Sequence, residues 1–319
     1  MSEPHRIAVN EGSPEGSNSA YVLPDRGVVV DPGPPGNDDF ERVRAGIEAA
    51  GLAMTDVEHV VLTHWHVDHV GLAPRLADAA DATIHMHRRD APLLAEYREA
   101  RRRRVRRDAS VLAGWGAPKG RIEEVRERDA PSPLPDQTPV VAHEDGERVA
   151  DGELLHTPGH TEGHLAFRCD DVLFVGDTVL PTYTPNVGGS DTRAKNPLPD
   201  YLRTLRRLLR HDGECYPGHG DGLSLPERVG AIRSHHRQRA ERVAERLGAR
   251  GEATPWQVAV DLFGEMRGVH VKFGAGEAAA HLRALAAEAE APVSRVGSDP
   301  ERYVLDGAPA GAVPSSLFE

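Results

Sequence analysis

The stretch VEHVVLTHWHVDH, residues 57–69, decides the fold. It begins as an apolar run of strand length and then places four metal-binding side chains within six residues: His64, His66, Asp68 and His69. Imidazole and carboxylate groups are good zinc ligands, whereas burying such polar groups without partners would cost roughly 2–7 kcal/mol each. A solvated, histidine-rich loop is the simpler alternative. The motifs farther along the chain favour a metal site.

Three further motifs follow in chain order. They are TPGHTEGH at residues 157–164, FVGDT at 174–178 and YPGHG at 216–220. Together with HWHVDH at residues 64–69, they resemble the motif set of the metallo-β-lactamase superfamily, whose signature is H-x-H-x-D-H. The resemblance covers at least residues 5–220. TPGHTEGH is especially similar to the glyoxalase II (hydroxyacylglutathione hydrolase) group.

The resemblance implies a set of seven metal ligands. They would be His64, His66 and His160 for the first metal, Asp68, His69 and His219 for the second, and Asp177 as a bridge between the two. The presence of both Asp68 and His69 favours two metals over one. The expected metals are two zinc ions, with iron or manganese as alternatives because sites containing carboxylates also accept them.

Such a centre predicts hydrolysis. Two metals about 3.5–4 Å apart can share a bridging water and lower its pKa to about 7. The resulting hydroxide attacks an electrophilic carbonyl or phosphorus centre, and the metals stabilise the negative charge that develops. Asp68 is the candidate catalytic residue, because it could orient this water or shuttle its proton.

Three residues near the motifs are candidates for supporting the ligands. Metal-binding histidines usually donate their other ring nitrogen to a carboxylate or a carbonyl group. Asp31, before the turn PGPPG, could accept such a bond or could simply start the turn, and Thr63 is a second candidate. His164 could support the site or could be a structural histidine that starts a strand.

The first 247 residues predict one catalytic domain of the α/β (α+β) class. Short apolar runs at 5–9, 19–23, 27–31 and 57–62 are typical of strands, and the spacing within 38–50 predicts a helix. Further strands are expected between residues 138 and 175, and residues 115–137, which contain four prolines, are expected to be mostly loop. The family resemblance implies a four-layer αββα sandwich.

Residues 248–319 predict a small C-terminal domain. Helices over 255–263 and 274–290, followed by a hairpin within 292–305, are typical of a winged helix. This part resembles the winged-helix domain appended to one branch of the superfamily, a branch that includes endoribonucleases. From Arg239 onward nine basic residues face twelve acidic ones, which is a poor balance for binding phosphates. A role in shaping the substrate pocket or in a homodimer contact is therefore expected.

The composition of the chain limits its expected partners and location. The 319 residues carry a formal net charge of −12, which argues against a large non-specific nucleic-acid surface. Cys169 and Cys215 are not in a C-x-x-C arrangement, so buried free thiols are expected. The first twelve residues lack a signal-peptide pattern, and no apolar run approaches about 18 residues. We expect a cytoplasmic protein without membrane contact.

Two features remain open to more than one interpretation. The arginine-rich stretch Arg101–Arg107 could bind a phosphate or carboxylate group, or it could be a solvated helix face balanced by nearby acidic residues. His235 and His236 lie on an expected helix and are interpreted as surface residues.

The leading function hypothesis is hydrolysis of a small ester or thioester, similar to that of hydroxyacylglutathione hydrolase, with a small acyl or thioester molecule as partner. The alternatives are a single-strand endoribonuclease, with RNA as the partner, and a non-catalytic binding or regulatory protein that retains the fold. The complete ligand set favours an enzyme over the last alternative.

Overall fold

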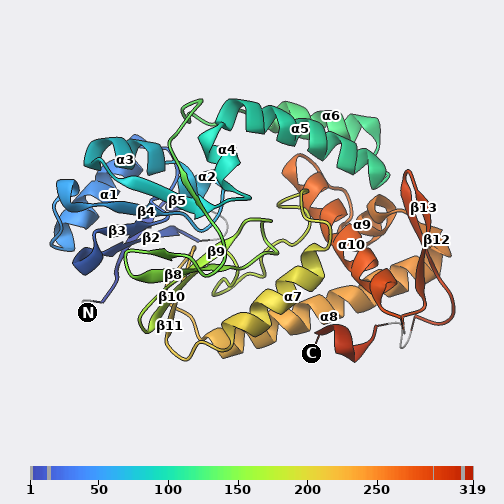
Figure 1. Cartoon of the computed structure of the whole chain (residues 1–319). Helices are drawn as coiled ribbons and strands as arrows, with labels where there is room; N and C mark the ends of the chain where they lie inside the picture. The colour runs from blue at the N-terminus through green and yellow to red at the C-terminus, as the bar shows by residue number, and fades with distance from the viewer. Residues whose placement is uncertain (1–2, 13–15, 290, 310–312, 319) are drawn as a thin grey trace. The chain divides into compact units, whose positions relative to one another are not determined.

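The computed structural model of the chain describes residues 3–12, 16–289, 291–309 and 313–318. The chain forms two compact units, each assembled from three stretches of sequence (Figure 1). The first unit contains residues 1–101, 131–185 and 208–228, and the second contains 102–130, 186–207 and 229–319. The expected domain boundary between residues 247 and 248 stays a prediction.

A six-stranded sheet forms one half of the first unit. Its strands are β1 (His5–Val9), β2 (Asn18–Leu23), β3 (Val28–Val30), β4 (His59–Val61), β5 (Thr83–His87) and β6 (Val141–His143), in that spatial order. The first three strands pair antiparallel, whereas β3, β4, β5 and β6 pair parallel. The carboxyl ends of these parallel strands therefore meet at one edge of the sheet.

A five-stranded sheet forms the other half of this unit. Its spatial order is β11 (Glu214–Pro217), β10 (Val172–Gly176), β9 (Leu165–Cys169), β8 (Gly152–His156) and β7 (Arg148–Val149). Only β10 and β11 pair parallel, which brings their carboxyl ends together. Cys169 and Cys215, on β9 and β11, are buried free thiols, as the sequence predicts.

Alternating side chains build a core on each face of the first sheet. Val29 and Val60 belong to a buried cluster with residues of α1 (Asn37–Ala49) and α3 (Ala73–Ala80), whereas Val30 and Val61 pack in a second cluster with residues of β8, β9 and β10. Two helices thus cover one face and the second sheet covers the other (Figure 1). This arrangement confirms the mixed α/β class.

A chain of hydrogen-bonded histidines crosses three strands of the first sheet. The His143 Nδ1 atom lies 2.7 Å from Glu147 Oε2, His85 Nδ1 lies 2.9 Å from His143 Nε2, and His59 Nδ1 lies 3.1 Å from His85 Nε2. Each neutral ring can donate from Nδ1 and accept at Nε2, so one orientation satisfies the whole chain. Burial, with the neighbouring His143 and His59, lowers the pKa of His85 to about 4.

The second unit is mainly helical. It contains most of α5 (Tyr97–Gly114), α7 (Pro197–Leu208) and α8 (Leu225–Arg250), together with α6 (Lys119–Arg128), α9 (Pro255–Phe263) and α10 (Val269–Ala287). A small sheet has the order β12 (Glu252–Ala253), β14 (Glu301–Leu305) and β13 (Val293–Ser298). The hairpin expected near the C-terminus is present as β13 and β14, while its assignment to a winged helix stays a prediction. None of the helices in the described ranges is both long and apolar enough to cross a bilayer.

Most of residues 115–137 lie outside helices and strands, as expected, although α6 occupies Lys119–Arg128 between Pro118 and Pro131. One expectation about the second unit is wrong. His236 is not a surface residue, since only 1% of it is exposed and its Nδ1 atom lies 3.3 Å from His281 Nε2. It shares a buried helix face with Ile232 and Ala240, four residues to either side.

The arginine-rich part of α5 supplies an internal ion cluster. Asp108 is buried, and it accepts hydrogen bonds from Thr192 Oγ1 at 2.6 Å and from Lys272 Nζ at 3.3 Å. Arg104 lies 3.4 Å from the same carboxylate and makes two further hydrogen bonds to Asp129. Arg104 is thus balanced by acidic residues, as one interpretation of the stretch expects, but with only 16% of its side chain exposed it does not lie on a solvated face.

We expect His85 to make the protein less stable in acid. Its pKa in the folded state lies below its unfolded value, so its stabilising contribution is complete above about pH 6.5 and is lost as the pH falls toward 4. This loss amounts to about 1–2 kcal/mol after allowance for solvent screening. Urea unfolding at pH 7 and pH 4.5 should show a weaker pH dependence for His85→Leu than for the wild type. The exposed His270→Leu serves as the control, and an unchanged pH dependence in His85→Leu would contradict this expectation.

We also expect Asp108→Leu to destabilise the second unit by about 3–5 kcal/mol, because it leaves the buried Lys272 ammonium without its carboxylate. The double variant Asp108→Leu/Lys272→Met removes both charges and should recover most of the loss. Denaturant unfolding followed by circular dichroism measures both effects. A double variant as unstable as Asp108→Leu would show that the ion pair is not the cause.

Candidate metal centre

The loops at the carboxyl ends of four strands are joined by backbone hydrogen bonds. Asp31 N donates to Val61 O, Leu165 N donates to Thr63 O, and Gly218 N donates to Gly176 O, over 3.1, 2.6 and 2.9 Å. These bonds tie the ends of β3 and β4 together, connect them to the start of β9, and tie the end of β10 to that of β11. Every loop that carries a predicted ligand is thus anchored at its base.

The first predicted group of ligands forms a compact triad. His64 and His66 follow β4, and His160 lies in the turn between β8 and β9. The His66 Nδ1 atom lies 3.0 Å from His64 Nε2 and 3.1 Å from His160 Nε2. The three side chains offer one nitrogen atom each within a space that could hold a metal ion.

The second predicted group lies beside the first. Asp68 and His69 are on the short helix α2 (Val67–Val70), and His219 follows β11. The Asp68 Oδ2 atom lies 3.6 Å from His69 Nε2 and 3.4 Å from His219 Nε2. This group also satisfies the geometry of a metal site.

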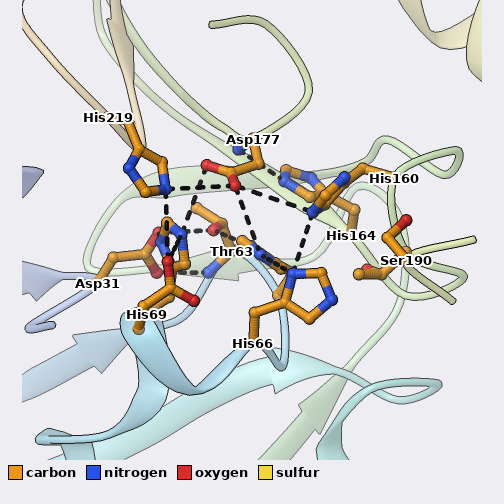
Figure 2. Close-up of polar contacts among 12 residues, drawn as sticks. Asp31, Thr63, His66, His69, His160, His164, Asp177, Ser190 and His219 are labelled. Carbon is orange, nitrogen blue, oxygen red and sulfur yellow. Dashed lines mark hydrogen bonds and ion pairs between the residues drawn. The ribbon is translucent and has the colours of Figure 1, made fainter. Parts of the chain in front are cut away.

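Asp177 lies between the two groups. Its carboxylate oxygens lie 3.9 Å from His64 Nε2 and 3.8 Å from His160 Nε2 on one side, and 3.5 Å from the Nε2 atoms of both His69 and His219 on the other. Figure 2 shows the carboxylate between His219 and His160. The structure thus brings all seven predicted side chains together.

Hydrogen bonds on the outer side of the rings set the tautomers. Asp31 accepts a hydrogen bond from Thr63 Oγ1 at 2.6 Å and lies 3.0 Å from His69 Nδ1. Because Thr63 donates its hydroxyl proton to Asp31, its oxygen accepts from His64 Nδ1, which lies 3.0 Å away. His219 Nδ1 faces the Gly16 carbonyl at 3.2 Å. All three rings therefore keep the Nε2 lone pair for the centre.

His164 supports the centre without facing it. Its Nε2 atom accepts a hydrogen bond from the Asp177 backbone amide at 3.1 Å, so in the neutral ring Nδ1 carries the proton and donates to Thr157 Oγ1 at 2.8 Å. The ring also stacks on His64 with centroids 5.0 Å apart. His164 therefore fixes the backbone of Asp177 and has no nitrogen left for a metal.

The electrostatics of the centre favour a bound cation. Burial lowers the pKa of His64 well below its usual value and that of His66 to about 3, so both rings are neutral. Burial also opposes protonation of His69 and His219, but the neighbouring carboxylates, Asp177 and Asp68, together outweigh it and raise the pKa of both rings, that of His219 to about 10. Although burial opposes ionisation of Asp68, the nearby His69 and His219 keep its pKa below the usual range. Protons on His69 and His219 thus occupy positions that a metal can take instead.

Two observations test whether this donor set fits a metal. The Oδ1 atom of Asp177 is buried and accepts no hydrogen bond among the described residues, which is costly unless a cation satisfies it. A Cβ atom on Gly218 would lie 2.3 Å from that oxygen and 2.8 Å from His69 Cε1, so only glycine leaves this space open. Nitrogen and carboxylate donors in this combination suit zinc, iron and manganese.

One residue at the centre was not predicted. Asn18, the first residue of β2, is 1% exposed, and its amide group lies within 3.5 Å of Asp68, His69 and His219. It belongs to none of the four motifs and is separated from His219 by 201 residues. Only its place in an expected strand that begins near residue 19 pointed toward this sheet.

Comparison with known proteins identifies the family. Residues 12–219 match the model of the metallo-beta-lactamase superfamily. The chain is 28% identical over 271 residues to the probable metallo-hydrolase YqjP of Bacillus subtilis, covering 82% of this chain and 84% of that protein. It is 29% identical over 195 residues to the atrochrysone carboxyl ACP thioesterase of Emericella nidulans, covering 59% of this chain and 47% of the thioesterase.

A solved structure extends the similarity over nearly the whole chain. The metallo-beta-lactamase family protein TTHA1429 from Thermus thermophilus aligns with a TM-score of 0.73 and 28% identity, covering 95% of this chain and 98% of that one. The family match covers more than half of the sequence and includes all seven side chains of the candidate centre. The chain therefore belongs to the metallo-β-lactamase superfamily and is a metallo-hydrolase.

Proposed function

We propose that this enzyme uses two metal ions to hydrolyse a small thioester or ester, with thioesters of the hydroxyacylglutathione type in the substrate class. The observation that carries the proposal is the position of Asp177 between two complete triads of donors. His64, His66 and His160 would hold one metal, and Asp68, His69 and His219 would hold the other. A pair of divalent ions, zinc first and iron or manganese as alternatives, would supply an activated water and polarise the substrate carbonyl.

The remaining chemistry falls to the side chains of this chain. Asp68 is the most accessible of the carboxylates at the centre, with 31% of its side chain exposed against 4% for Asp177 and 3% for Asp31. Since the pKa of Asp68 is held below its usual range, its carboxylate stays charged. A group that stays charged is a weak general base but a strong hydrogen-bond acceptor, so Asp68 would orient the attacking water rather than take up its proton.

The thioester preference rests on a relative. The similar protein from Emericella nidulans is described as an acyl-carrier-protein thioesterase, although the match spans about half of its length. Hydrolysis of a thioester splits the bond between the carbonyl carbon and sulfur, with addition of water, to give a carboxylate and a free thiol. A two-metal centre would supply the nucleophile and the charge stabilisation that attack on such a carbonyl needs, for thioesters as for esters.

We expect the metal-loaded enzyme to hydrolyse at least one of S-lactoylglutathione and a short acyl-CoA, and to leave single-stranded RNA intact. Thiol release measured with a chromogenic reagent and gel analysis of RNA provide the readouts. His69→Ala should lower thioesterase activity by at least about 100-fold, because it removes a ligand outright. RNA cleavage without thioester turnover would reverse the assignment, and metal-free protein with full activity would rule out the metal mechanism.

Asp31→Asn tests the support of the ligands separately. The amide oxygen accepts a weaker bond from His69 Nδ1 than the carboxylate does, so we expect metal affinity to fall by about 10–100-fold without loss of the fold. Competition titration with a zinc chelator measures the affinity, and circular dichroism monitors the fold. Asp56→Asn, an exposed carboxylate in the same unit, is the matched control. Equal affinities for the two variants would show that Asp31 does not act on the centre.

A further inference from the structure

The Asn18 side chain lies close to all three members of the second triad, Asp68, His69 and His219. Its Nδ2 atom lies 3.0 Å from Asp68 Oδ2, 3.5 Å from His69 Nε2 and 3.4 Å from His219 Nε2. Asp68 Oδ2 itself lies 3.6 and 3.4 Å from the same two ring nitrogens. The amide group therefore approaches each member as closely as Asp68 approaches the two histidines.

The backbone fixes Asn18 against the strand end that carries His219. Asn18 and His219 form an antiparallel β-bridge, and it is flanked by bonds from Ser19 N to Gly218 O and from Gly220 N to Ser17 O, both 2.9 Å long. This pairing holds the backbones of Asn18 and His219 side by side. The Asn18 side chain therefore starts from a fixed place beside one of the predicted ligands.

The far end of the amide is fixed as well. Asn10 Nδ2 donates to Asn18 Oδ1 at 2.8 Å, and the Asn10 backbone amide is held by Asp39 Oδ1 at 2.9 Å. With its oxygen engaged by Asn10, Asn18 presents its NH₂ group to the centre. Of the three groups that it meets there, the Asp68 carboxylate is the nearest and the only anion.

We propose that Asn18 is a positioning residue for the second metal, acting through Asp68. The inference rests on the proposed two-metal function. Asp68 is the most exposed member of its triad, with 31% of its side chain accessible against 0% for His69 and 1% for His219. Its side chain is therefore the least restrained by packing and the most able to rotate away from the metal position. A charge-assisted hydrogen bond from a neutral donor restrains this carboxylate and leaves its negative charge available to the cation.

The proposal predicts an effect on one metal only. In the full-length protein stripped of metal, stepwise titration with Co²⁺ gives two dissociation constants, and the visible spectrum reports coordination. Asn18→Ala should raise the dissociation constant of the second metal by about 10–100-fold and leave that of the first within about threefold. At saturating Co²⁺ the spectrum should match that of the wild type, because no ligand has been removed.

Ser19→Ala is the matched control. Ser19 follows Asn18 on the same strand. Its hydroxyl donates to the Gly220 carbonyl at 2.6 Å and accepts from Arg6 Nε at 2.8 Å, and among the described residues it makes no hydrogen bond to a predicted ligand. If Asn18 had a purely structural role, Asn18→Ala would weaken the binding of both metals and lower the thermal stability of the metal-free protein. Ser19→Ala would then have the same effects. This result would overturn the proposal. An unchanged second constant would overturn it too, as would an altered spectrum at saturation, which would mean that Asn18 binds the metal through its oxygen.

The same titration separates this inference from the function on which it rests. Wild-type protein that binds fewer than two Co²⁺ ions would contradict the two-metal function before any variant is compared. Two ions bound by the wild type, with both constants unaffected in Asn18→Ala, would contradict the role of Asn18 alone. A near-isosteric variant, Asn18→Leu, repeats the comparison without opening a cavity beside β2, and it should behave like Asn18→Ala.

Discussion

The centre depends on the outer hydrogen bonds that occupy Nδ1 of three buried histidines, His64, His69 and His219. A neutral imidazole has one proton and one lone pair, so assigning the proton to an outer partner leaves the lone pair for the centre. The outer partner that accepts the hydrogen bond is Asp31 for His69, Thr63 for His64 and the Gly16 carbonyl for His219. If these outer partners were absent, the same rings could turn or protonate, and the donor set would lose its order.

Those outer partners depend in turn on the parallel pairing of strands. Asp31 reaches Thr63 because β3 and β4 run side by side and end together. Asp177 and His219 meet for the same reason at the ends of β10 and β11. Successive apolar residues along these strands point to opposite faces and bury both faces of the first sheet. The core thus determines where the polar side chains emerge.

The seven ligands could be predicted from the sequence because they lie in short motifs at strand ends. The same motifs, with the apolar runs before them, also predicted the mixed α/β class. The role of Asn18 could not be predicted from the sequence, because its contact with His219 forms only when two distant segments of the chain pair. His236 was misjudged because a polar residue on a helix suggests the surface, whereas His281 supplies a buried partner. The second unit draws on three separate stretches, so local patterns reveal its helices but not their assembly.

Differences in exposure within the centre indicate how it is used. The side chains of His64, His69, His219 and Asp177 are at most 4% exposed, and that of His160 is 9% exposed, whereas 31% of Asp68 is accessible. Under the proposed function, a substrate would approach the partly exposed carboxylate of Asp68 beside these more deeply buried donors. To orient a water molecule, Asp68 must keep one position and remain accessible, and burial would remove the access. A hydrogen bond from a buried amide can restrain the carboxylate without covering it. Asn18, whose amide oxygen is held by Asn10, is in a position to supply this bond.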